Sequence, residues 1–335
     1  MTSMERRSER SQMGETINPA PTDAASRDVE LWRMNGLVGT ALTRHGPMLF
    51  FKNDCGALTS SLQAYGEWAE HEIMFCKRFL SQGDIVLDVG AYIGSHSLAF
   101  AQFVGPTGHV YGFEAQPASF ALLVQNLLAA RITNVTARNA AVGAVDAETL
   151  IALDEIDIAR QCSFGSTAVS ATGDAGLRTQ VPATSLDQLD LGRCSFMKID
   201  VEGMEDRVLA GAQRLLRSCA PVVYAECNTV DAGSRTIAQL RAAGYDVWLH
   251  AAAAFNPENW RTNPVNIFGD AKEMALVGVP PHLGAACGSL RVGVHERFFA
   301  INTIDDLVAG MLLKPQYPRE VLLRTTACQA DGRHV

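Results

Sequence analysis

The chain has 335 residues, of which 47% are hydrophobic and 19% are charged, and its formal net charge is −8. This balance is typical of a globular protein and argues against nucleic acid as the main partner, because phosphate backbones are bound by clustered Lys and Arg. No run approaches the roughly 18 apolar residues of a membrane span, and the first residues lack the apolar stretch of a signal peptide. We therefore expect a cytoplasmic protein with no membrane span.

Two segments precede the main pattern of the chain. Residues 1–28 are polar and not periodic, which predicts a disordered tail. Residues 29–83 contain short apolar runs, GPMLFFKN among them, and an amphipathic helix is predicted over 67–80. These features indicate a small β/α lead-in before the main domain.

A strand–helix alternation begins at residue 84 and continues to residue 281. Its apolar runs do not alternate with polar residues, which is typical of a parallel sheet covered on both faces. The predicted fold class is α/β, with a doubly wound, mostly parallel, seven-stranded and Rossmann-like sheet. The predicted strands are 84–89, 109–114, 134–142, 196–202, 221–227, 245–250 and 273–279. The predicted helices are 94–104, 117–130, 204–216 and 234–243.

Three other parts of the chain are less informative. The insertion at 143–195 contains the small, polar stretch SFGSTAVSATGDAG (163–176), which is either a lid or substrate loop or a passive hairpin. The stretch NPENWRTNP (256–264) either offers amides and the Trp260 ring to a sugar or forms a plain surface turn. Residues 282–335 have weak patterning and form a C-terminal extension of unknown role.

The stretch DIVLDVGAYIG (84–94) joins the first predicted strand of the sheet to a helix through a glycine turn. The dinucleotide fingerprint GxGxxG is incomplete there, because Tyr92 stands at its middle glycine. Asp88 would also repel a phosphate. S-adenosylmethionine fits this turn better, since it has no phosphate and carries an ammonium and a sulfonium group. Asp88 is then predicted to lie near the cationic end of the cofactor, and the alternative is that Asp88 only caps the next helix.

The other predicted cofactor contacts lie at the same edge of the sheet. The glycines let the backbone approach the cofactor, and Glu114 ends the second strand, where it can accept hydrogen bonds from both ribose hydroxyls. Asn139 and Ala140 follow the third strand and are placed to flank the adenine ring. The predicted cofactor-binding residues are Asp88, Gly90, Ala91, Tyr92, Gly94, Glu114, Asn139 and Ala140.

The segment KIDVEGME (198–205) supplies the predicted catalytic residues. Lys198, Asp200 and Glu202 alternate with apolar residues, so their side chains should share one face near the strand end. We expect Asp200 to accept the proton of the methyl acceptor or to orient that acceptor. Glu202 and Glu205 are expected to shape the pocket, with Lys198 as charge partner. The alternative is that this group is a structural ion-pair cluster.

Two alternatives to this catalytic assignment stay open. His71 and His96 are rival bases, although a lone His at a helix start is more often only a helix-start side chain. Asp200, Glu202 and Glu226 could instead chelate Mg²⁺, which prefers hard oxygen ligands. We expect no metal, and retained activity in excess EDTA is the test of that expectation.

Seven stretches of the chain together carry a family resemblance. They are YGEWAEHEIMF, GDIVLDVGAYIGSHSLAFA, VYGFEAQP, NAAVG, VPATSLDQL, FMKIDVEGMEDRVLAGA and NPENWRTNPVNIFGDAKEMALVGVP. In this order they resemble the FkbM-type methyltransferases, from about residue 56 to residue 281. These enzymes are class I and S-adenosylmethionine-dependent, largely O-methyltransferases of sugars, glycans and natural products. The resemblance implies that Asp88, Gly90, Gly94 and Glu114 bind the cofactor. The family commonly has Asn at the position of Tyr92.

We therefore expect a methyltransferase domain over 84–281 that methylates a hydroxyl of a small molecule or glycan. The alternative is a protein that binds the cofactor but has lost the chemistry. The Asn/Asp-Pro-Pro-aromatic motif of many N-methyltransferases is absent, and the missing middle glycine disfavours an oxidoreductase. The sequence leaves the oligomeric state and the identity of the acceptor open.

Overall fold

The computed structural model describes residues 36–147, 149–165 and 178–313. The predicted tail at 1–28, most of the predicted loop at 163–176 and the end of the C-terminal extension lie outside these ranges.

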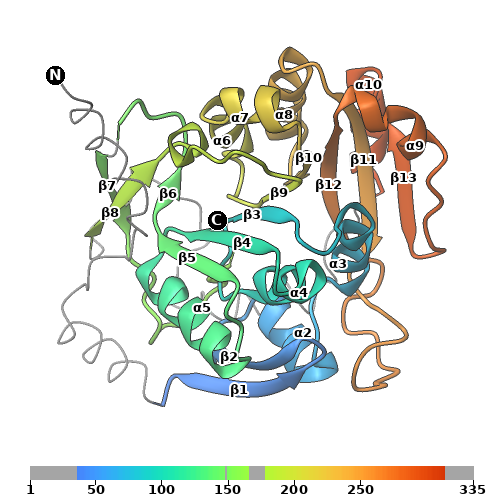
Figure 1. Ribbon diagram of the computed structural model, residues 1–335. Helices are drawn as coiled ribbons and strands as arrows, with labels where there is room; N and C mark the ends of the chain where they lie inside the picture. Colours follow the sequence, from blue (N-terminus) through green and yellow to red (C-terminus); the bar gives the residue numbers. More distant parts are fainter. Residues whose placement is uncertain (1–35, 148, 166–177, 314–335) are drawn as a thin grey trace, which may run out of the picture. The chain divides into compact units, whose positions relative to one another are not determined.

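An eight-stranded sheet forms the centre of the described chain (Figure 1). Its strands are β3 (Ile85–Val89), β4 (His109–Glu114), β5 (Val135–Asn139), β9 (Phe196–Ile199), β10 (Val222–Glu226), β11 (Asp246–Ala253), β12 (Lys272–Val279) and β13 (Glu296–Ala300). The strand order is β13-β11-β12-β10-β9-β3-β4-β5. The five strands from β10 to β5 are parallel, whereas β12 and β13 are antiparallel to their neighbours. The α/β prediction is confirmed, but the predicted count of seven strands is wrong, because β13 adds an edge strand beyond residue 281.

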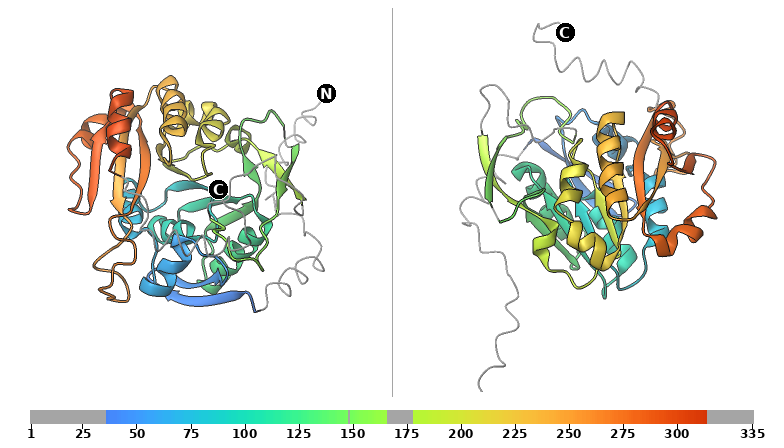
Figure 2. Two further views of the ribbon diagram at one scale, coloured as in Figure 1. Left: turned by 180° about the vertical axis from the view of Figure 1, so that it is seen from behind. Right: turned by 90° about the horizontal axis from the view of Figure 1, so that it is seen from above.

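Helices cover both faces of this sheet, α4 and α5 on one face and α6 to α8 on the other (Figures 1 and 2). Their bounds are α4 (Ser95–Val104), α5 (Pro117–Ala129), α6 (Glu205–Ala210), α7 (Gln213–Cys219) and α8 (Val230–Ala242). The single helix predicted over 204–216 is wrong, because the chain breaks into α6 and α7. A Cβ on Gly211 at this break would overlap the carbonyl oxygen of Gly143, so the chain passes here against the start of the insertion.

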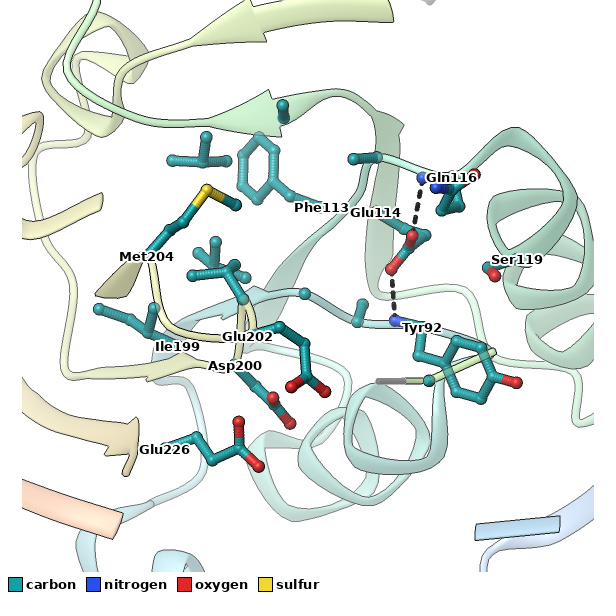
Figure 3. A pocket seen from close by; sticks show the side chains of 18 of the residues that line it. Tyr92, Phe113, Glu114, Gln116, Ser119, Ile199, Asp200, Glu202, Met204 and Glu226 are labelled. Atoms are coloured by element: carbon teal, nitrogen blue, oxygen red, sulfur yellow. Dashed lines mark hydrogen bonds between the residues drawn. The ribbon is translucent and has the colours of Figure 1, made fainter. Parts of the chain in front are cut away.

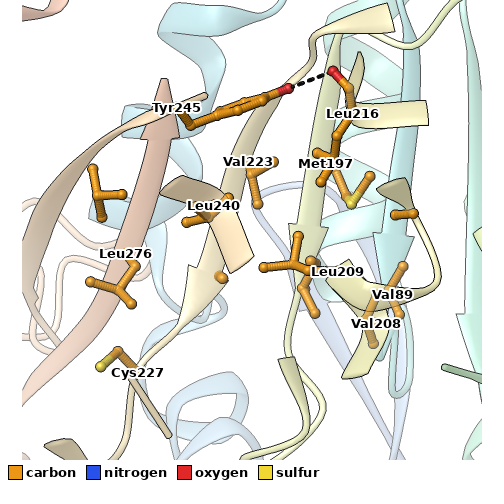
Figure 4. Packing of buried hydrophobic residues seen from close by; sticks show 14 of the residues in the cluster. Val89, Met197, Val208, Leu209, Leu216, Val223, Cys227, Leu240, Tyr245 and Leu276 are labelled. Carbon is orange, nitrogen blue, oxygen red and sulfur yellow. Dashed lines mark hydrogen bonds between the residues drawn. The ribbon is translucent and has the colours of Figure 1, made fainter. Parts of the chain in front are cut away.

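The α8 helix also starts earlier than predicted. Thr229 Oγ1 accepts a hydrogen bond of 3.1 Å from the backbone N–H of Ala232, which satisfies one of the free N–H groups at the helix start. Buried apolar side chains from α6 to α8 pack against one face of the sheet, as Figure 4 shows. This packing holds the strands in place, so their carboxyl ends form a defined edge. The labelled members of the cluster are Val89, Met197, Val208, Leu209, Leu216, Val223, Cys227, Leu240, Tyr245 and Leu276.

The lead-in consists of an antiparallel hairpin and short helices. Its elements are β1 (Val38–Thr43), β2 (Gly46–Phe51), α2 (Ala57–Tyr65), α3 (Glu70–Cys76) and the 3-10 turn η1 (Lys77–Phe79). The helix predicted over 67–80 therefore begins at Glu70 and ends in a 3-10 turn. Asn126 of α5 accepts a hydrogen bond from Leu49 N at 2.6 Å and donates one to Leu49 O at 3.1 Å, which fastens the hairpin to the main domain.

The insertion and the C-terminal part both contain regular structure. The insertion forms a small sheet of order β6-β8-β7, and Ala152 and Ala183 of this sheet line the cavity described below. No helix in the described ranges is both long enough and apolar enough to cross a bilayer. The remaining elements are β6 (Ala141–Val142), β7 (Thr149–Asp154), β8 (Arg178–Thr184), η2 (Leu186–Leu189), η3 (Pro281–Leu283), α9 (Gly284–Gly288) and α10 (Ile304–Met311).

Candidate active site

A cavity of about 880 Å³ lies at the carboxyl ends of β3, β4, β9 and β10 (Figure 3). Ligands of doubly wound sheets bind at this edge, and small-molecule sites commonly measure about 300–1,000 Å³. The cavity wall also includes residues 54–58 of the lead-in and residues 163–165 of the insertion. The main sheet, the lead-in and the insertion therefore all contribute residues to one site.

The glycine turn after β3 brings two strand ends into contact. Gly90 has a φ of 81°, and a Cβ at this position would overlap the carbonyl oxygen of Asp200, which follows β9. Gly94 has a φ of 93°, and its Cβ would lie 2.6 Å from Leu123 Cδ1. Both positions therefore require glycine, for the backbone conformation and for the close approach. Gly90 lines the cavity, whereas Gly94 starts α4 behind it.

Replacing Gly90 by Ala is expected to lower the free energy of unfolding by at least about 3 kcal/mol, because the new Cβ meets backbone that cannot move away easily. Denaturant unfolding measures this change. Gly192→Ala is the matched control, since Gly192 is exposed and a Cβ there would meet nothing within 4 Å. Equal stability of the two variants would contradict the contact between the two strand ends.

Glu114, at the end of β4, is held with its carboxylate at the cavity. Its Oε2 accepts a hydrogen bond from Tyr92 N and its Oε1 accepts one from Gln116 N, each at 2.8 Å (Figure 3). Burial raises the pKa of Glu114 to about 7, although the two backbone hydrogen bonds favour the carboxylate. The structure thus places the predicted ribose-binding acid in the cavity, in a fixed orientation.

Tyr92 lines the cavity and connects the glycine turn to the lead-in. Its φ is 48°, and its hydroxyl donates a hydrogen bond of 3.1 Å to Asp54 Oδ2. Asp54 also accepts hydrogen bonds from Thr59 Oγ1 at 2.7 Å and from Phe164 N at 3.1 Å. The Tyr92 ring points away from Asp200 in Figure 3. The tyrosine that departs from the family pattern therefore joins the lead-in and the insertion across the turn.

Asp88 and Asn139 support the cavity from behind. Asp88 is fully buried, accepts a hydrogen bond from Ser97 Oγ, and is not among the described residues that line the cavity. The N-cap residue of α4 is Gly94 and no side chain caps this helix, so Asp88 does not cap it either. Asn139 Nδ2 donates to the carbonyl oxygens of Glu114 at 2.8 Å and Ala115 at 2.9 Å, which fixes the end of β4. Direct cofactor contact by these two side chains stays a prediction.

Two other predicted cofactor residues, Ala91 and Ala140, do line the cavity. Their small side chains add apolar surface between the polar groups that the neighbouring strand ends present.

The β9 strand ends at Ile199, so Asp200 and Glu202 lie in the turn that follows rather than in the strand that we predicted over 196–202. Lys198 Nζ nevertheless lies 2.9 Å from Asp200 Oδ2, as a shared face predicts. Figure 3 shows Asp200, Glu202 and Glu226 grouped together. Glu202 has a φ of 53°, a strained conformation of a kind that is often found at functional sites.

The surroundings shift the pKa values of Asp200 and Glu226 in opposite directions. Burial opposes ionisation of Asp200, but Lys198 and a hydrogen bond with Glu226 outweigh it and lower the pKa of Asp200. Burial and the neighbouring Asp200 and Glu202 carboxylates raise the pKa of Glu226 well above its ordinary value. Burial also disfavours the charged form of Lys198, yet the carboxylates around it raise its pKa. Asp200 therefore favours the ionised form beside the Lys198 ammonium, whereas Glu226 favours the protonated form.

Glu205, the fourth predicted catalytic residue, closes the turn after β9. Its Oε1 accepts hydrogen bonds from Gly203 N at 3.0 Å and Val201 N at 3.3 Å, and only 2% of the residue is exposed. It is not among the described residues that line the cavity. Glu205 therefore supports the turn that carries Asp200 and Glu202.

The two histidines that we treated as rival bases differ in position. His71 Nδ1 lies 3.0 Å from the Ala253 carbonyl oxygen, and His71 is not among the described lining residues. His96 does line the cavity, and its Nε2 lies 2.9 Å from Oε1 of Glu72. The sequence analysis missed Glu72. The only sequence signal for it is the run of acids in EWAEHE. The structure shows that all three of these acids, Glu67, Glu70 and Glu72, are buried.

Carboxylates dominate the charged lining of the cavity. The lining contains seven acidic side chains and two basic ones, Lys198 and Arg207. Such a lining disfavours phosphate groups and favours a cationic ligand. The acids are Asp54, Glu72, Glu114, Asp200, Glu202, Glu226 and Glu273.

One carboxylate oxygen from each of Asp200, Glu202 and Glu226 lies within 4.8 Å of the other two, close enough to hold a metal ion. The Lys198 ammonium, however, already neutralises Asp200 and would repel a dication. We therefore expect methyl transfer to continue in excess EDTA at an unchanged rate. Loss of turnover that Mg²⁺ restores would instead assign these three residues as metal ligands.

The strand order, the glycine turn after β3 and the acid that ends β4 together define the class I, S-adenosylmethionine-dependent methyltransferase fold. Residues 88–247 match the family model described as the methyltransferase FkbM domain. These residues therefore form an FkbM methyltransferase domain, as the resemblance of the sequence implied.

Individual proteins show more distant similarity. The FkbM methyltransferase structure from Methylobacillus flagellatus KT is 14% identical, with a TM-score of 0.39 over 66% of this chain and 58% of that chain. A SAM-dependent O-methyltransferase structure from Thermotoga maritima is 15% identical, with a TM-score of 0.37 over 72% of this chain and 77% of that chain. A curated protein-L-isoaspartate O-methyltransferase from Methanothrix thermoacetophila is 42% identical over 57 residues, which are 17% of this chain and 27% of that protein. The match thus spans about a quarter of the curated relative.

Proposed function

We propose that the protein methylates a hydroxyl group of a sugar, a glycan or another natural product, with S-adenosylmethionine as the methyl donor. The observation that carries this proposal is an acid-lined cavity in which the glycine turn and Glu114 lie together. The acidic lining suits the ammonium and sulfonium groups of the donor and disfavours the phosphates of a dinucleotide. The volume of about 880 Å³ leaves room for an acceptor beside the donor.

The residues at the ends of β3, β4 and β5 fit the donor. Gly90 and Ala91 line the cavity, so the donor can lie against the backbone of the glycine turn. The Glu114 carboxylate can accept hydrogen bonds from two ribose hydroxyls. Ala140 and Val142 offer apolar surface to the adenine ring. S-adenosylmethionine, when bound, supplies an electrophilic methyl group.

The residues at the ends of β9 and β10 fit the acceptor. Asp200 is held by Lys198 and remains ionised, so it can accept a hydrogen bond from an acceptor hydroxyl and orient its oxygen. Orientation of two reactants can contribute on the order of 7 kcal/mol or more to lowering a barrier. We therefore assign Asp200 the orienting role, with Glu202 as part of the acceptor wall. The lowered pKa makes Asp200 a weak base.

The test is transfer of labelled methyl from S-adenosylmethionine to a panel of sugars, glycans and hydroxylated natural products. We expect label in an ether that resists alkali, whereas a methyl ester would release it. Label on nitrogen or on a carboxylate would contradict the proposal. Tight donor binding without transfer to any acceptor would favour the second candidate, a cofactor-binding protein that has lost the chemistry.

A further inference from the structure

A histidine and a glutamate from separate parts of the chain meet at the cavity. His96 lies in the first turn of α4, and Glu72 lies on α3 of the lead-in. His96 Nε2 lies 2.9 Å from Glu72 Oε1, and the His96 side chain is only 8% exposed. Both residues line the cavity that also contains Asp200. The lead-in, outside residues 88–247, thus contributes a charged group to the site.

The charge of Glu72 fixes how the His96 ring can act. Burial opposes ionisation of Glu72, but its pairing with His96 and the positive charge of Lys198 outweigh burial and lower the pKa of this carboxyl. An ionised Glu72 draws the ring proton of a neutral imidazole to Nε2 and leaves the lone pair on Nδ1. Ser95 Oγ lies 3.5 Å from Nδ1, which is longer than a well-formed hydrogen bond. An acceptor hydroxyl can therefore replace this contact.

We infer that His96 is the general base that takes the proton of the acceptor hydroxyl, and that Glu72 positions it. This inference rests on the proposed function and adds the proton acceptor to it. Asp200 is less suited, because Lys198 lies 2.9 Å from its carboxylate. As the acceptor oxygen forms its bond to the methyl carbon, the carbon–sulfur bond breaks and its electron pair returns to sulfur. The hydroxyl proton passes to His96 Nδ1 and leaves to water after product release.

The charged groups that act on His96 come from two directions. Glu72 contacts the ring from α3, and Asp200 acts on it from the end of β9. Both carboxylates stabilise the imidazolium that forms during transfer. Phe100 packs against the ring from α4, with ring centroids 5.7 Å apart. Glu72 and Asp200 therefore favour transfer of the acceptor proton to this ring.

The first arm of the test needs no acceptor. Ring ¹⁵N shifts of the labelled protein with bound S-adenosylhomocysteine report the tautomer of each histidine, and His96→Gln assigns the His96 signal. We expect the Nε2–H tautomer in the wild-type protein and loss of this preference in Glu72→Gln. An Nδ1–H tautomer, or a ring that stays protonated up to pH 9, would overturn the inference even if no acceptor had been found.

The second arm uses an acceptor found in the methyl-transfer assay. We expect His96→Ala to lower kcat about 100-fold or more with donor affinity within threefold, and imidazole to restore part of the rate. Glu72→Gln should lower kcat about 10-fold or more and move the acid limb of the pH profile to lower pH, whereas Glu72→Asp should retain most of the rate. Unchanged kcat and pH profile in both His96→Ala and Glu72→Gln would overturn the inference while leaving methyl transfer by the wild type intact.

The same helix provides a matched control. Glu70 on α3 pairs with His45 Nε2 at 3.0 Å, and both are buried or half-buried. Neither is among the described residues that line the cavity. Glu70→Gln and His45→Gln should therefore lower the melting temperature without moving kcat or the pH profile. If they reduced kcat as much as Glu72→Gln at equal loss of stability, the effect would belong to the fold of α3 and the inference would fail.

Discussion

Replacing Glu114 by Gln is expected to weaken S-adenosylmethionine binding by about 30- to 150-fold. Hydrogen bonds to a charged group contribute about 2–3 kcal/mol, and Gln has only one acceptor oxygen for two ribose hydroxyls. The side chain is well placed for this role, because two backbone N–H groups hold it at the cavity. Isothermal calorimetry measures the affinity. Glu155→Gln is the control, since Glu155 is exposed and outside the described lining.

The pH dependence of binding provides a second readout of Glu114. Its pKa is raised to about 7 by burial, and the carboxylate is the form that accepts both hydrogen bonds. Affinity should therefore be full above pH 7 and fall as the pH drops through 7, by about tenfold between pH 8 and pH 6. Glu114→Gln should lose this dependence. An unchanged affinity in the variant would remove Glu114 from the donor site.

Replacing Asp200 by Asn is expected to lower turnover by about 100-fold or more while changing donor affinity much less. The amide keeps the shape of the side chain but loses the charge that orients the acceptor hydroxyl. Lys198 would also lose its nearest counter-charge, so we expect a loss of stability. Turnover under donor saturation, together with a thermal melt, separates the two effects.

Asp206→Asn is the control for this variant. Asp206 lies on α6, close along the chain, and its Oδ2 lies 3.4 Å from Arg235 Nε at the surface. Its removal should leave turnover within about twofold. Near-normal turnover of Asp200→Asn would move the orienting role to Glu202 or Glu226, the two carboxylates beside it.

The sheet and the glycine turn could be predicted from the sequence because their signals are local. The apolar runs and the helices between them are each written in a few consecutive residues. The strand β13 was missed because ERFFA is a short edge strand, in which polar and apolar residues mix. The break between α6 and α7 was missed because it depends on Gly211 packing against Gly143, far away in sequence.

The site was less predictable than the fold, for the same reason. Alternation along β3 fixes which face Asp88 points to, but not that α4 and Ser97 cover it completely. Glu72 reaches the cavity only because the lead-in packs on the main domain. The role of Tyr92 depends on Asp54, which binds both the Tyr92 hydroxyl and the Phe164 backbone and is distant from both in sequence. Contacts between distant segments decide these roles, and a single sequence does not encode them in any short pattern.

The central claim is that the cavity takes a cationic, phosphate-free nucleoside as its methyl donor. Calorimetric titration of the full chain with S-adenosylmethionine and, in parallel, with NAD⁺ tests this claim most directly. We predict one binding site for S-adenosylmethionine, lost in Glu114→Ala, and no measurable binding of NAD⁺. Binding of NAD⁺ but not of S-adenosylmethionine would contradict the assignment of the site and the function derived from it.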